Sequence, residues 1–90
     1  MVDTYLPGAE LIHQGLADLA AGSVTTESLL VSIAAPGLRE LGFDVGPAIM
    51  NAELELFHLM SLRHGSAAHS RYNALVRRVV SFRRAAQCAR

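Results

Sequence analysis

The chain has 90 residues, 51% of them hydrophobic, a length that accommodates one domain and leaves little room for a separate catalytic subdomain. No run of about 18 apolar residues occurs, which excludes a membrane span, and the single cysteine, Cys88, excludes an internal disulfide. The formal net charge is zero, but residues 1–62 hold one arginine and eight acids, while residues 63–90 hold seven arginines and no acid.

The spacing of apolar residues predicts an all-α fold, a compact bundle of about four helices that forms a single domain over residues 1–90. Apolar residues recur three and four positions apart, and runs of β-branched residues are short. The first helix is expected over residues 7–21, with Gly22 as its stop. Its apolar face comprises Ala9, Ile12, Leu16, Leu19 and Ala20.

The second helix is expected to begin at Thr25 or Thr26, whose hydroxyl can cap the first free backbone amides. Its apolar residues are Leu29, Leu30 and Ile33. Pro36 then interrupts the pattern, and proline suits the first turn of a helix better than its interior. We therefore expect a separate short helical turn over residues 36–41, closed by Gly42.

The third helix is expected over residues 52–64, after a connection that ends at the N-cap candidate Asn51. Its apolar residues point in nearly every direction around the helix, namely Leu54, Leu56, Phe57, Leu59, Met60 and Leu62. In a soluble protein this distribution indicates burial on most sides. We therefore expect this helix to lie at the centre of the fold or in a dimer interface.

The fourth helix is expected over residues 66–89 and carries most of the positive charge. Eight residues form an apolar band about 160° wide: Ala68, Tyr72, Leu75, Val76, Val79, Val80, Phe82 and Ala86. Arg71 and Arg78 lie along one edge of this band, Arg77 and Arg84 lie near the other, and Arg83 falls inside it. Arginines at such edges are placed to pair with charges on a neighbouring helix.

The hydrophobic content exceeds what one small globule readily hides, so the pattern favours self-association. We expect a small helical interaction or assembly module that forms a homodimer and has no catalytic activity of its own. The expected interface residues come from the third and fourth helices: Leu54, Phe57, Leu59, Met60, Tyr72, Leu75, Val79 and Phe82.

The arginines of the fourth helix have three candidate partners: carboxylates of the same fold or of a second subunit, another acidic protein, and nucleic acid. The charged partner-binding residues are Arg71, Arg77, Arg78, Arg83 and Arg84. The chain also contains eight acids and its isoelectric point is near 6.9, so the composition favours carboxylates over phosphates. The candidate acids are Glu10, Asp18, Glu27, Glu40, Glu53 and Glu55.

Residues 63–69 contain an arginine, Arg63, then a polar residue, and a histidine, His69, six positions after the arginine. This spacing resembles the R-x4-6-H signature of HEPN ribonucleases, which are small α-helical bundles. The resemblance covers seven residues and implies that the two side chains lie together near a helix start, where they serve phosphodiester cleavage. The alternative function is thus a nucleic-acid-interacting protein that uses the fourth helix, either as a binder or as a HEPN-like ribonuclease with Arg63 and His69 as its catalytic residues.

No metal or cofactor is expected. No two histidines lie four positions apart, no pair of cysteines exists, and the glycines do not form a phosphate-binding loop. The N-terminus lacks the basic segment of a secretory signal. We therefore expect a cytoplasmic protein without a membrane partner.

Overall fold

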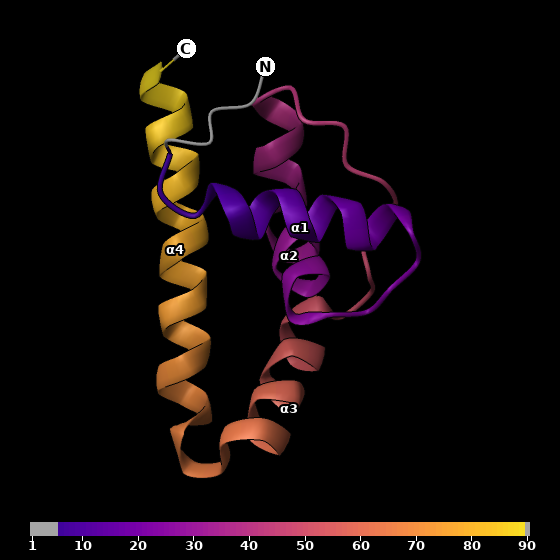
Figure 1. Cartoon of the computed structure of the whole chain (residues 1–90), viewed down its shortest axis with the longest axis vertical. Helices are drawn as coiled ribbons and strands as arrows, with labels where there is room; N and C mark the ends of the chain where they lie inside the picture. The colour runs from indigo at the N-terminus through magenta and orange to yellow at the C-terminus, as the bar shows by residue number, and fades with distance from the viewer. Residues whose placement is uncertain (1–5, 90) are drawn as a thin grey trace.

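The computed structural model describes residues 6–89 and is mainly helical, with no strand in that range. The helices are α1 (Ala9–Ala20), α2 (Thr26–Glu40), α3 (Ala52–His64) and α4 (Ala68–Ala89), and a 3₁₀ turn, Gly65–Ala67, joins the last two. α4 runs along the length of the molecule, α1 crosses in front of α2, and α3 forms a hairpin with α4 (Figure 1). The predicted all-α class is confirmed.

The centre of the fold is α2, because the other three helices all pack against it. Nine of its 15 residues are buried, among them Leu29, Leu30, Val31 and Leu38. α3 buries only Ala52, Leu56 and Met60. Of the two places expected for the third helix, the centre of the fold is therefore wrong, and a dimer interface stays a prediction. One side of α3 contacts α2 and α4, and the other side faces solvent.

The predicted separate turn over residues 36–41 is also wrong, because α2 continues through Pro36 to Glu40. Proline in a helix interior costs about 3 kcal/mol, since it removes one backbone hydrogen bond. Residues on both sides of it are buried, namely Ala34, Ala35, Gly37 and Leu38, whereas Pro36 itself is exposed. Burial of this continuous face offsets the cost, so tertiary packing overrides the local preference.

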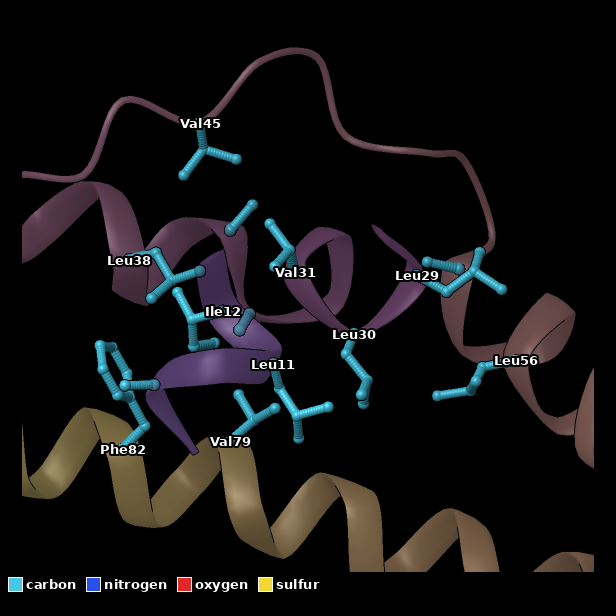
Figure 2. Close-up of a cluster of buried hydrophobic side chains, with 14 of the residues drawn as sticks. Leu11, Ile12, Leu29, Leu30, Val31, Leu38, Val45, Leu56, Val79 and Phe82 are labelled. Carbon is cyan, nitrogen blue, oxygen red and sulfur yellow. The ribbon is translucent and has the colours of Figure 1, made fainter. Parts of the chain in front are cut away.

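The core is formed by side chains that converge from all four helices (Figure 2). Leu11 and Ile12 of α1 meet Val79 and Phe82 of α4 below the apolar face of α2. Phe82 is the largest fully buried side chain, and its ring lies 5.7 Å from that of Phe43. Burial of these side chains is the main source of stability for the bundle.

The start of α2 is fixed by a capping box at Thr25, which confirms one of the two predicted caps. Thr25 Oγ1 accepts a hydrogen bond from the Ser28 amide at 3.1 Å, and Ser28 Oγ accepts one from the Thr25 amide at 2.7 Å. The Thr25 hydroxyl also donates to Asp18 Oδ2 at 2.7 Å. This last bond ties the end of α1 to the start of α2.

The connection between α2 and α3 is held to the core at three points. Val45 is buried and points from the loop toward α2 (Figure 2). The Ile49 amide donates to the buried Ser32 Oγ at 2.9 Å, and Arg39 donates to the Gly46 carbonyl at 3.0 Å. These contacts fix the path of the loop that leads into α3.

Candidate interaction surfaces

The solvent side of α3 is the largest concentration of exposed apolar residues in the described part of the chain. Within residues 6–89, five large hydrophobic residues are exposed. Four of them lie in or next to α3, namely Met50, Leu54, Phe57 and Leu62, and the fifth is Val24. Leu54 and Leu62 are 68% and 77% exposed. At about 100° per residue, Leu54, Phe57, His58, Ser61 and Leu62 share one side of the helix, opposite Ala52 and Leu56. These five residues are called the outer face of α3.

Beside the outer face lies an aromatic hollow of about 450 Å³, between α3 and α4. It is lined by Asn51, Glu53, Leu54, Phe57, His69, Tyr72 and Asn73. The Phe57 ring meets the Tyr72 ring edge-on at 5.9 Å and the His69 ring at 6.4 Å. Such edge-to-face contacts hold Phe57 against α4 while one side of its ring remains exposed.

Burial raises the pKa of the Tyr72 hydroxyl above its ordinary value, and the negative charge of Glu53 raises it further. A raised pKa means that the folded chain holds the phenolic proton more tightly than the unfolded chain. The stability that this proton contributes is present below about pH 10 and is lost as the pH rises through the folded-state pKa.

Glu53→Gln is therefore expected to lower the pKa of Tyr72, because it removes the nearby negative charge. The measurement is an absorbance titration of the phenolate in a Tyr5→Phe background. Glu55→Gln, on the same helical turn, makes the same change in net charge and serves as the control. Equal shifts in the two variants would show that Glu53 does not act on Tyr72 directly.

The structure divides the predicted interface residues into three groups. Leu54 and Phe57 are exposed, as an interface requires. Leu59, Tyr72 and Leu75 are half-buried against the core. Met60, Val79 and Phe82 are at most 5% exposed and belong to the core of the single chain, so their assignment to a subunit interface is corrected.

Leu62 was absent from the predicted interface, although it is among the most exposed hydrophobic residues. Its signal in the sequence is its spacing, because Leu62 follows Leu54 by eight residues and lies on the same side of a helix. The buried residues Leu56 and Met60 are four residues apart and share the opposite side of the helix. The positions of these two pairs therefore distinguish the exposed side of α3 from its buried side.

The arginines of α4 have different surroundings. Arg78 forms an ion pair with Glu10 of α1, which confirms the predicted carboxylate partner for this residue. Arg83 lies over Gly37 of α2, and its buried Nε has no hydrogen-bond partner in residues 6–89. Arg77 donates to the Asn73 carbonyl of its own helix at 3.4 Å. Arg84 is exposed beside Arg77 on the solvent side of α4.

A second hollow, of about 530 Å³, is basic and lies where the start of α2, the end of α3 and one edge of α4 meet. Its basic side chains are Arg63, His64, Arg71 and Arg78. Arg63 Nη1 donates to Thr26 Oγ1 at 3.5 Å across the hollow. These four side chains and Thr26 define the basic hollow.

The structure does not bring Arg63 and His69 together. Arg63 lines the basic hollow, whereas His69 lines the aromatic hollow. The residues of α4 that line the two hollows are on opposite edges of the helix, because His69 and Arg71 are about 200° apart around it. The arrangement implied by the resemblance to HEPN ribonucleases, with both side chains on one phosphodiester, is not formed.

No group of three or more His, Cys, Asp or Glu side chains within residues 6–89 is placed to hold a metal ion. Over the same range, no helix combines the length and the apolar content that a bilayer crossing needs. Comparisons of the chain with protein-family models, with curated proteins and with solved structures find no match. What the chain does is therefore inferred from its own surfaces.

Proposed function

We propose that the chain is a small helical assembly module that forms a homodimer through the outer face of α3. The observation that carries this proposal is the gathering of exposed hydrophobic residues in and next to α3. Contiguous apolar surface of this kind marks sites of protein contact, because water leaves it favourably on association. The exposed side of Phe57 and the aromatic hollow extend the same surface toward α4.

The spacing along the outer face suits a second copy of the same helix. Leu54, His58 and Leu62 are four residues apart and form one ridge along α3. When two such ridges pack antiparallel about a two-fold axis near His58, Leu54 of each copy lies opposite Leu62 of the other. An interface of this type is self-complementary, as a symmetric dimer requires.

The charges of α3 favour the same antiparallel arrangement. Its first turn carries Glu53 and Glu55, and its last turn carries Arg63 and His64. Antiparallel packing opposes the two helix dipoles, and it places the acidic start of one copy near the end of the other that carries His64, whereas Arg63 lies on the far side of the helix from the outer face. A parallel pair would place like charges together at both ends.

The test uses two single variants, Leu54→Glu and Leu62→Arg. In a homodimer each places a charge opposite a leucine at two symmetric positions. Loss of a buried leucine contact costs about 1.5–3 kcal/mol, so two losses weaken dimerisation about 100-fold or more. Sedimentation analysis is expected to show each variant as a monomer at concentrations where the unmodified chain is a dimer.

Mixing the two variants is expected to restore a dimer. In the mixed pair, one contact is leucine against leucine and the other is glutamate against arginine, so no charge faces an apolar side chain. Val24→Glu changes an exposed hydrophobic residue that is outside the outer face of α3, and it should leave the dimer intact. A monomeric unmodified chain would refute the proposed homodimer, and failure of the mixture to associate would refute its antiparallel register.

A further inference from the structure

We propose that the basic hollow binds a small anion that carries phosphate groups. The site is separate from the outer face of α3, because Arg63 and Leu54 lie about 180° apart around that helix. The proposal concerns a ligand site and does not depend on dimer formation.

The hollow gathers basic side chains from two helices. Arg63 and His64 come from the last turn of α3, and Arg71 and Arg78 come from one edge of α4. Positive groups that share one hollow repel one another unless negative charge lies between them. Guanidinium groups also present paired N–H donors that match the oxygens of phosphate.

Carboxylates of the chain neutralise this hollow only in part. Glu10 pairs with Arg78, and Glu27 is among the residues that line the hollow. Within residues 6–89, the hydrogen bond of Arg63 is to Thr26, and Arg71 has no ion pair with a carboxylate. Arg63 and Arg71 therefore have donors that are free to bind an anion from solution.

The size and the other polar groups of the hollow suit a compact ligand. Its volume, about 530 Å³, is in the range of sites for small molecules. The hydroxyl of Thr26 adds an uncharged donor at the same place. Met60, Ala74 and Leu75 line the hollow as well, so part of its lining is apolar.

The positions of the arginines around α4 favour a small ligand over a polynucleotide. A nucleic-acid strand requires a row of cations on an open surface. Arg77 and Arg84 are on the solvent side of α4, about 100° or more around the helix from Arg71 and Arg78. They lie outside the basic hollow and supply a matched control for its arginines.

The experiment measures binding of inorganic pyrophosphate to the unmodified chain by calorimetry at low ionic strength. Arg63→Gln combined with Arg71→Gln is expected to weaken binding at least tenfold. Arg77→Gln combined with Arg84→Gln makes the same change in net charge and is expected to change binding less than twofold. Circular dichroism of each variant establishes that the helices are retained.

Glu27→Gln is expected to strengthen pyrophosphate binding, because it removes the carboxylate from the lining. Leu54→Glu is expected to leave binding unchanged, so failure of the dimer and failure of this site are distinguishable. Absence of pyrophosphate binding, or equal loss in the two arginine pairs, would overturn the proposal. So would binding of single-stranded RNA that depends on Arg77 and Arg84 while pyrophosphate does not bind.

Discussion

Replacement of Phe82 by alanine is expected to lower the free energy of unfolding by about 3–5 kcal/mol, the loss typical of a large core residue. Phe82 is 1% exposed, and it is the largest of the fully buried side chains. Its ring contacts Phe43 at 5.7 Å and packs between α4 and the first residues of α1, where Gly8 approaches its Cβ. Truncation would leave a cavity at the junction of three segments.

The matched control is Phe57→Ala, which removes the same atoms from a side chain that is 39% exposed. Both variants are measured by denaturant unfolding in the Leu54→Glu background, so that self-association does not contribute to the difference. Phe57→Ala is expected to cost less, about 1–2 kcal/mol, because its ring is already partly in water and a smaller cavity forms. Similar losses at the two positions would show that Phe82 does not anchor α4 to the core.

Such a loss matters because a domain of this size is marginally stable. Typical unfolding free energies are about 5–15 kcal/mol, so the truncation removes at least about a fifth of the total, and most of it in a domain at the lower end of that range. A domain of 60–100 residues loses about 4–8 °C in melting temperature for each kcal/mol. Phe82→Ala is therefore expected to melt at least 12 °C below the background variant.

The fold class could be predicted from the sequence because helical periodicity is a local property. The start of α2 follows from the capping box at Thr25, and the end of α3 follows from Gly65. Asn51 precedes α3 as predicted, but its side chain makes no capping hydrogen bond. The path through Pro36 could not be predicted in this way. Whether a helix tolerates proline depends on residues packed around Ala34, Ala35 and Leu38, and these come from other elements.

The candidate surfaces were predicted only in part, for a related reason. An apolar residue in a helix can face the core of its own chain or a partner, and periodicity alone does not distinguish them. Met60, Val79 and Phe82 face the core, whereas Leu54 and Leu62 face solvent. The arginines show the same limit, because only the packing of α1 against α4 places Glu10 beside Arg78.

The crossing of α1 over α2 depends on the absence of a side chain at Gly15, so Gly15→Ala is expected to be strongly destabilising. A Cβ at this position would overlap Val31 Cγ2 and the carbonyl oxygen of Glu27, and it would lie 2.9 Å from the Glu27 carbonyl carbon. A side chain can rotate away, but the backbone of α2 cannot move without separating the two helices. Overpacking of this kind costs about 1–3 kcal/mol, and more where backbone must shift.

The sign of the change in the free energy of unfolding is informative, because alanine stabilises an isolated helix by about 1 kcal/mol relative to glycine. A net loss of about 2–3 kcal/mol therefore means that the overlap outweighs the gain in helix propensity. Gly46→Ala is the control, since a Cβ there has no neighbour within 4 Å, and it is expected to be nearly neutral. If Gly15→Ala unfolds at the same denaturant concentration as the unmodified chain, α1 does not cross α2 at this distance.

The close approach of α1 to α2 brings Leu11 and Ile12 into the core beside Val79. It also places the carboxylate of Glu10 beside Arg78, at one side of the basic hollow.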